Sequence, residues 1–315
     1  MWKFFKNWTL PIAMAVGTLG YFIFANVTFL YPAKPYINSF VAFITPVLIF
    51  AQLLLTFCKI ELKELKPSPW HAWLLMFQAL TTLIVAAFLI FFPIHSPYKD
   101  IFEGALVCLI CPTATAAAVI TSKLGGSAPS LTTYTLLSNI LAAVFVPLLF
   151  PLVEVHVGAT FITAFLRILG KVCPLLILPF IMAFFFRYFM PPIHRFLVSL
   201  KDLAFYIWSV ALAIVTAQTV RSLVQSSVDG YVQLALCGMG LLTCAIQFVV
   251  GKKIGSRYND RISAGQALGQ KNTVLAIWMA YTYLNPVSSV APGSYVLWQN
   301  IFNSWQLWKK RKQEA

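Results

Sequence analysis

The stretch Gly269-Gln270-Lys271-Asn272 places a charged residue in the middle of an apolar segment, residues 262–284, where a helix is expected to break. A second apolar segment, residues 101–123, is interrupted by Cys111-Pro112-Thr113-Ala114-Thr115. Proline removes a backbone donor, and small residues let helices approach closely. An ionisable residue at such depth is typical of a functional site. The two stretches therefore predict two broken helices.

The composition of the chain predicts that these segments lie in a membrane. Its 315 residues are 60% hydrophobic and only 10% charged, with a mean hydropathy of +0.80, which is more apolar surface than a soluble globule can bury. Runs of about 20 apolar residues are long enough to cross a bilayer. The predicted fold class is an all-α membrane protein with ten transmembrane helices, near residues 9–31, 37–58, 69–94, 101–123, 129–153, 166–190, 202–223, 230–252, 262–284 and 287–308.

The basic residues predict the orientation of the chain. With the amino terminus inside, 17 Lys and Arg residues fall in inner joints, 5 in outer joints, and Lys271 alone within the membrane, which accounts for all 23. Because basic residues accumulate on the cytoplasmic side, we expect a multi-pass protein of the cell membrane with both termini cytoplasmic. A positive inner rim also explains the net charge of +14 without nucleic-acid binding. The first span follows Lys3 and Lys6 as a signal peptide would, but it runs long and lacks a clear cleavage site.

The titratable residues do not form a catalytic or metal-binding pattern. The six cysteines lie in or beside apolar spans, and the CxxC spacing of Cys108 and Cys111 lacks neighbouring polar ligands, which favours packing. The four histidines are scattered, and the acidic residues gather at span edges. Intramembrane catalysis would need an acid and a base there. We therefore expect no enzyme, no metal site and no cofactor.

The two interruptions fall in the fourth and ninth of the ten predicted spans. Broken helices at matching positions of two halves indicate an inverted repeat with its substrate site near the midplane. This predicts two five-helix repeats, residues 1–155 and 156–315, in one membrane domain. A Pro kink and a weak Gly helix are the structural alternative, but they do not explain the polar residues at both breaks and along residues 132–139.

These two stretches resemble the bile acid:sodium symporter superfamily. Cys111-Pro112 through Gly126 is similar to the family's CPGGTASN motif in its first crossing helix, and Gly269 to Asn272, with Pro292-Gly293 and Trp298-Gln299-Asn300, is similar to its second crossing helix and tenth helix. The similar stretches cover about a quarter of the chain. The resemblance implies that a core of helices 3–5 and 8–10 moves against a panel of helices 1, 2, 6 and 7, with substrate beside the crossing.

The chain departs from the family pattern where that pattern binds sodium. Ala117-Ala118 stands in place of Ser-Asn, Ala267 in place of a Glu, Lys271 in place of a Gln, and Leu131 in place of a Ser. The residues that keep the family's type, or lie beside the altered positions, are expected to be ion-site remnants: Gln78, Thr135 and Gln270. Sodium needs several oxygen ligands, so the departures predict a transporter without sodium coupling, in which the Lys271 ammonium occupies the vacated cation position.

Lys271 has two predicted roles beyond that of filling the vacated cation position. Desolvation of a buried lysine favours its neutral form and would permit proton coupling; alternatively, the charged form pairs with an anionic substrate. A lysine that snorkels to the membrane surface is the non-functional alternative. The expected substrate is an organic anion, with contacts carried over from the resemblance to Thr115, the Ala116 backbone N–H, Lys271, Asn272, Gln299 and Asn300.

The predicted function is secondary active or facilitative transport of an organic anion by alternating access in the lipid bilayer. Two alternatives remain open at this point. One is a sodium symporter whose ion sites are rebuilt from Thr113, Gln266, Gln270 and Thr135. The other is a membrane receptor that binds a ligand without moving it. Flux into sealed vesicles separates the receptor from the transporters.

Overall fold

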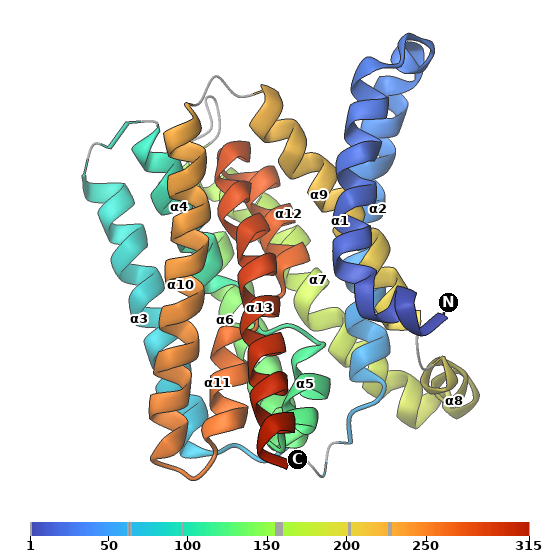
Figure 1. Cartoon of the computed structure of the whole chain (residues 1–315), viewed down its shortest axis with the longest axis vertical. Helices are drawn as coiled ribbons and strands as arrows, with labels where there is room; N and C mark the ends of the chain where they lie inside the picture. The colour runs from blue at the N-terminus through green and yellow to red at the C-terminus, as the bar shows by residue number, and fades with distance from the viewer. Residues whose placement is uncertain are drawn as a thin grey trace. The chain divides into compact units, whose positions relative to one another are not determined.

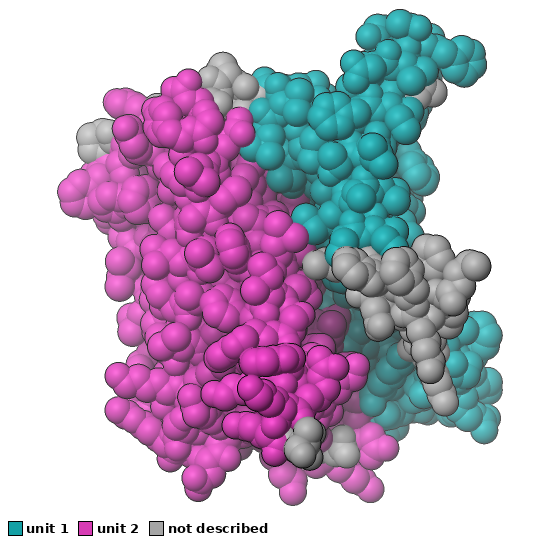
Figure 2. Space-filling model, in the orientation of Figure 1, with its two compact units in different colours: residues 1–59, 178–227 teal, residues 60–177, 228–315 magenta. Residues whose placement is uncertain are grey.

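The structure, a computed structural model, describes residues 2–61, 63, 65–92, 94–95, 97–154, 160–200, 203–225 and 229–314. The described residues are almost wholly helical, and their β-type pairing is one isolated antiparallel bridge between Thr113 and Lys271. Each of the ten predicted spans contains helix. The chain divides into two compact units, residues 1–59 with 178–227 and residues 60–177 with 228–315 (Figure 2).

Unit 1 is built on a three-helix contact. Its α9 (Leu203–Gln225) packs against both α1 (Trp2–Asn26) and α2 (Lys34–Phe57), which are joined by the short helix η1 (Thr28–Ala33). The α1–α9 approach requires glycine, because a Cβ at Gly17 would lie 2.2 Å from the backbone oxygen of Ala213.

Unit 1 also holds the end of α7 (Phe161–Phe189) and a short helix, α8 (Pro191–Ser199). A joint is predicted between the spans 166–190 and 202–223, and the structure has the helix α8 there instead. It begins with two prolines, which suit the first positions of a helix because no intrahelical donor is lost there. Its nine residues are too few for the apolar-run criterion that located the longer spans.

Unit 2 contains both broken helices (Figure 1). The long helix α10 packs against α4, α11 and α13, while α11 also packs against α5 and α6. The bounds of the helices of unit 2 are α3 Pro69–Phe91, α4 Tyr98–Ile110, α5 Ala117–Leu124, α6 Ala128–Val153, α10 Gly230–Ser256, α11 Arg261–Gly269, α12 Thr273–Tyr283, η3 Pro286–Ser289 and α13 Val290–Glu314.

Both predicted breaks are present. The segment between α4 and α5 and the segment between α11 and α12 are non-helical, and residues 103–113 and 263–280 are buried without exception. A helix that is buried all round shows no amphipathic stripe. These two buried stretches therefore form the centre of unit 2, and their polar residues, among them Thr113 and Lys271, are removed from solvent.

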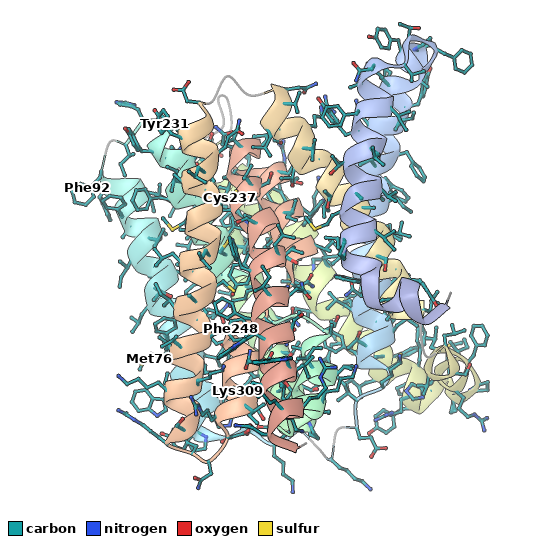
Figure 3. All side chains as sticks on the ribbon, viewed as in Figure 1. Met76, Phe92, Tyr231, Cys237, Phe248 and Lys309 are labelled. Atoms are coloured by element: carbon teal, nitrogen blue, oxygen red, sulfur yellow. The ribbon has the colours of Figure 1, made fainter. Side chains whose placement is uncertain are left out.

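Apolar side chains are also exposed on the outside of unit 2. Met76 on α3 and Tyr231 on α10 point away from the helices that carry them (Figure 3) and are 46% and 58% exposed. Such surfaces suit lipid rather than water. Six helical stretches of the described residues are long and apolar enough to cross a membrane: Tyr31–Phe57, Pro69–Phe91, Ala128–Val153, Phe161–Phe189, Leu203–Gln225 and Gly230–Ser256.

The chain is thus an all-helical, multi-pass membrane protein. The complete ten-helix inverted repeat stays a prediction, because α13 and the broken helices are not among the six long apolar stretches and α1 contributes only a shorter apolar stretch, Pro11–Asn26. The predicted boundary between repeats, 155/156, falls among residues 155–159, outside the described residues. The two compact units cut across the predicted halves: α3–α6 and α10–α13 lie in unit 2, while α1, α2 and α9 lie in unit 1.

Candidate functional site

The two breaks cross as short extended segments that hydrogen-bond to each other. Ala114 N donates to Gln270 O at 2.9 Å, and Asn272 N donates to Pro112 O at 2.8 Å. These two bonds flank the bridge between Thr113 and Lys271. Non-helical backbone at membrane depth is tolerated only where its polar groups find partners in the protein. At this crossing, each break satisfies groups of the other.

The carboxyl end of α4 has four carbonyl oxygens beyond its last intrahelical bond, those of residues 108–111. All four accept hydrogen bonds from side-chain nitrogens. Lys271 Nζ donates to Leu109 O at 3.3 Å, and Gln247 Nε2 donates to Cys108 O at 3.3 Å. The Gln78 amide donates to the oxygens of residues 110 and 111, at 3.0 and 3.2 Å. The unpaired carbonyls expected at a helix end are therefore capped by one ammonium and two amides.

The carboxyl end of α11 is capped by neutral groups. Thr113 Oγ1 donates to Ala267 O at 2.6 Å, and Tyr295 OH donates to Gly269 O at 2.8 Å. The oxygen of the next residue accepts the backbone N–H of Ala114. The hydroxyl of Ser138 donates toward Thr113 Oγ1 at 3.4 Å and accepts from the Thr113 N–H at 3.2 Å. Hydroxyl and backbone donors thus replace the ammonium used at α4.

Lys271 is fully enclosed, with 1% of its surface exposed. Its backbone N–H donates to Gln299 Oε1 at 2.9 Å while its ammonium reaches the end of α4. The carboxyl end of a helix carries partial negative charge, which favours a cation there. Among the described residues no carboxylate forms an ion pair with Lys271. The helix end therefore supplies the negative partner, and a lysine that snorkels to the surface does not describe this side chain.

The predicted substrate residues separate into two groups. Lys271, Asn272 and Gln299 meet at the crossing, where Asn272 Oδ1 caps α12 by accepting from Leu275 N at 3.3 Å. Thr115 is half-buried and Ala116 exposed at the start of α5. The Asn300 amide donates to Val296 O of its own helix, α13, at 2.7 Å. The structure brings together the first three, whereas the side chain of Asn300 is hydrogen-bonded along its own helix.

The predicted ion-site remnants also take different roles. Gln78 caps α4, and its Oε1 accepts a hydrogen bond from Tyr134 OH at 2.9 Å. Gln270 Nε2, in the second break, donates to Gln266 Oε1 of α11. Thr135 Oγ1 donates to Leu131 O of its own helix at 3.1 Å. Gln78 is therefore hydrogen-bonded to the helix end at the crossing, while the hydroxyl of Thr135 is hydrogen-bonded within α6.

Two residues of the crossing, Gln247 and Tyr295, were not predicted from the sequence, and Ser138 was expected only as one of the polar residues along 132–139. Gln247 links α10 to both the end of α4 and the Tyr295 hydroxyl, which lies 3.2 Å from its Nε2. A glutamine inside an apolar span is the signal that would have found it, because intramembrane polar residues usually carry a function. Tyr295 and Ser138 gave weaker signals, since hydroxyl side chains are common in membrane helices.

Two hollows open at the surface of unit 2, away from the residues of the crossing. Their volumes are about 350 and 460 Å³. None of the predicted substrate or ion-site residues lines either hollow. The first hollow is lined by Gly125, Gly126, Ser256, Asn259, Asp260, Arg261 and Ile262. The second is lined by Lys63, Lys66, Pro67, Ser68, Ser127, Pro129 and Ser130.

Comparison with known proteins shows the family to which the chain belongs. The family model described as "Sodium Bile acid symporter family" matches residues 45–226, more than half of the chain. The chain is also 25% identical over 303 residues to the "Uncharacterized sodium-dependent transporter YocS" of Bacillus subtilis (strain 168), an alignment that covers 92% of this chain and 91% of that protein. Two crossing broken helices in a multi-pass helical chain, together with the family match, show that this protein is a transporter that belongs to the sodium bile acid symporter family.

Proposed function

We propose that the protein transports an organic anion by alternating access without sodium coupling, and that the Lys271 ammonium serves as a fixed cation. The observation that carries the proposal is the hydrogen bond from Lys271 Nζ to Leu109 O, 3.3 Å, at the end of α4. In transporters with discontinuous helices, half-helix carboxyl ends and unwound carbonyls coordinate the coupling cation. The Lys271 ammonium lies at such a carboxyl end, which supports its role as a fixed cation.

The other donors at the end of α4 support the same proposal. Gln78 and Gln247 occupy the remaining carbonyl oxygens. A sodium ion at this end would have to displace these donors and lie close to a buried ammonium. Like charges a few ångströms apart in a low-dielectric site repel strongly. The expected oxygen ligands are also replaced by Ala117, Ala118 and Ala267.

The anionic class of the substrate rests on the start of α5. Thr115 and the Ala116 N–H precede a helix whose amino end carries partial positive charge, which favours an anion. Lys271 adds positive charge to the crossing, although its ammonium is directed to α4 rather than exposed. The basic residues at the ends of α5, α10 and α13 support cytoplasmic termini, in keeping with the positive-inside rule.

The proposal is tested by the thermal stability of the detergent-purified protein, titrated with sodium against choline at matched ionic strength. A ligand that binds only the native state raises stability by RT ln(1 + [L]/Kd), about 2.7 kcal/mol at a hundredfold excess over Kd. We expect identical curves for the two cations. A sodium-specific rise in Tm would overturn the fixed-cation proposal.

A second function, sodium-coupled transport, is favoured by the name of the relative YocS, which is described as sodium-dependent. Its ion sites would have to be rebuilt from Thr113, Gln266, Gln270 and Thr135. The side-chain bonds of these residues are directed to protein groups: Thr113 to Ala267, Gln270 to Gln266, and Thr135 to Leu131. Sodium-dependent stabilisation that is lost in Thr113→Val would support this alternative. Accumulation of solute in sealed vesicles would exclude a receptor that does not transport.

A further inference from the structure

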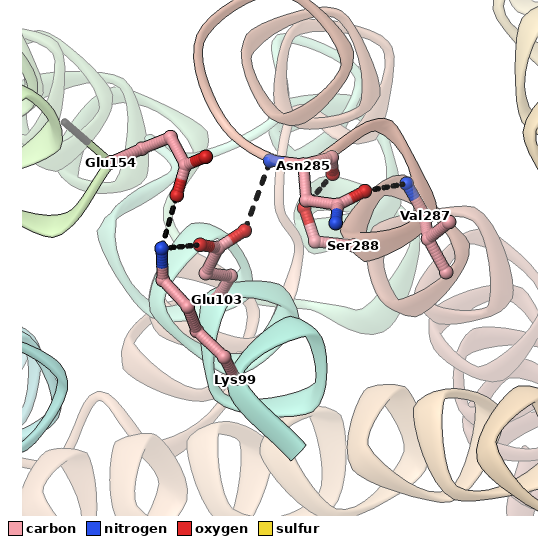
Figure 4. A network of polar contacts seen from close by, with 6 residues as sticks. All are labelled: Lys99, Glu103, Glu154, Asn285, Val287 and Ser288. Atoms are coloured by element: carbon pink, nitrogen blue, oxygen red, sulfur yellow. Dashed lines mark hydrogen bonds and ion pairs between the residues drawn. The ribbon is translucent and has the colours of Figure 1, made fainter. Parts of the chain in front are cut away.

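A charged network lies at the other end of α4, away from the crossing (Figure 4). Glu103, one turn into α4, has a side chain that is 0% exposed. Its Oε2 accepts a hydrogen bond from Asn285 N at 3.0 Å. Its Oε1 lies 3.5 Å from Lys99 Nζ and accepts no hydrogen bond from the described residues. One of the two oxygens of a fully buried carboxylate is therefore only weakly satisfied.

Lys99 is shared unequally between two carboxylates. Its ammonium makes a close hydrogen bond to Glu154 Oε2 and a longer ion pair to Glu103. The Lys99 and Glu154 side chains are 26% and 29% exposed, so both are partly open to the surface of the protein. Glu103 thus holds the more buried position and the weaker share of the cation.

Among the described residues whose charges act on Glu103, two are acidic and one is basic. Lys99, Glu154 and Asp100 are the charged groups that act on Glu103, and Asp100 is itself buried. Burial alone would lower the pKa of Lys99, but the hydrogen bond to Glu154 and the charges of both glutamates raise this pKa above its ordinary value. Lys99 therefore stays protonated over the pH range in which carboxylates titrate. Burying a carboxylate without sufficient partners is costly, and such a group gains by taking up a proton.

We propose that Glu103 is a proton-binding site, which takes up a proton from the aqueous phase at this end of unit 2. The bound proton neutralises negative charge that the basic group of the network does not balance. The site is placed where proton binding acts on both broken helices. Glu103 lies on α4, and its partner Asn285 caps η3, directly after α12. Loss of the carboxylate charge weakens the charge-assisted bond to Asn285 N. Proton binding therefore changes the hydrogen bond that joins the two broken helices at their ends away from the crossing.

A dependence of transport on pH follows from this site and rests on the transport function proposed above. Proton binding itself does not rest on that function. The sodium titration and the proton titration are separate measurements, so one proposal can fail while the other stands.

The test is a pH-difference infrared titration of the purified protein, which follows the carbonyl stretch of a protonated carboxylic acid. We expect the wild type to show a carboxylic acid that persists at pH values where exposed glutamates are ionised. Glu103→Gln should lose that signal. Glu61→Gln, at an exposed acid remote in sequence, is the matched control and should keep it. A signal that is unchanged in Glu103→Gln would overturn the proposal.

Two further variants decide the matter if Glu103→Gln does not fold. Lys99→Met removes the cation that favours ionised Glu103, so the titration should move to higher pH by about 1–3 units. Glu154→Gln removes a neighbouring negative charge and leaves Lys99 to Glu103, so the titration should move to lower pH. Shifts in opposite directions support proton binding at Glu103. Shifts in one direction, or none, overturn it.

Discussion

The two broken helices pose the same physical problem and solve it with different chemistry. Each ends at the crossing with carbonyl oxygens that have no intrahelical partner. The α4 end is capped by the ammonium of Lys271 and by two glutamine amides. The α11 end is capped by the hydroxyls of Thr113 and Tyr295. One end is thus compensated by a full positive charge and the other by neutral dipoles.

The caps at the two ends are reciprocal. Thr113 belongs to the first break and caps α11, whereas Lys271 belongs to the second break and caps α4. The two residues also face each other in the antiparallel bridge. The two helix ends that meet at the crossing therefore do not need caps of equal charge. The cation is associated with α4 only.

Reversal of the charge at residue 271 should have the largest effect. In Lys271→Glu, a carboxylate would face the negative end of α4 in a dry site, without the ammonium that now compensates it. We expect a loss of about 3–5 kcal/mol of stability, as for a buried charge without a partner. Size-exclusion chromatography and the unfolding temperature would measure it. A Lys271→Glu protein as stable as wild type would show that the charge at α4 is immaterial.

Removal of the Gln78 amide should cause the second-largest loss of stability. Gln78→Leu leaves two carbonyl oxygens of α4 and the Tyr134 hydroxyl without their partner. Each unsatisfied buried group costs about 1–3 kcal/mol, so we expect a total of about 3 kcal/mol, measured from the denaturant midpoint. Gln313→Leu, at an exposed position of α13, is the control and should be near neutral.

Removal of the neutral cap at α11 should cost less. Thr113→Val keeps the shape of the side chain but deletes the hydroxyl that donates to Ala267 O. This leaves one buried oxygen unsatisfied, at about 1–3 kcal/mol, against three groups in Gln78→Leu, so the fall in Tm should be smaller than for Gln78→Leu. If Thr113→Val proved more damaging than Gln78→Leu, the ranking of charged and neutral ends would have to be reversed.

The smallest effect is expected at Thr135. Its hydroxyl donates along α6 to Leu131 O, a local bond that competes with the helix rather than supporting the crossing. Thr135→Val should therefore change stability by less than about 0.5 kcal/mol. The same variant checks the sodium alternative: sodium-dependent stabilisation that is present in the wild type and absent from Thr135→Val would establish Thr135 as an ion ligand.

The positions of the breaks could be predicted because their residues carry local signals. Proline at 112 removes a donor, and a charge at 271 conflicts with an apolar span. The burial of Lys271 and its place at the crossing followed from these signals. Its partner did not, because Leu109 contributes a backbone oxygen, 162 residues away, and a carbonyl leaves no mark on the sequence.

The remainder of the site was predicted less completely for related reasons. Gln78 was expected as an ion-site remnant, but its role as a cap for α4 depends on how α3 packs against α4, which periodicity does not specify. Gln247 was overlooked although it interrupts an apolar span. The short helix α8 escaped notice because a criterion based on long apolar runs does not detect an amphipathic helix of nine residues.

The attachment of the Lys271 ammonium to the backbone has an energetic consequence for the proposed cycle. A sodium ion that enters from one side and leaves on the other carries an elementary charge across the bilayer, which contributes about 2.3 kcal/mol per 100 mV of membrane potential. A tethered ammonium returns with the protein and carries no net charge in a complete cycle. The electrical work of each turnover would then be set by the charge of the cargo and of any proton that accompanies it.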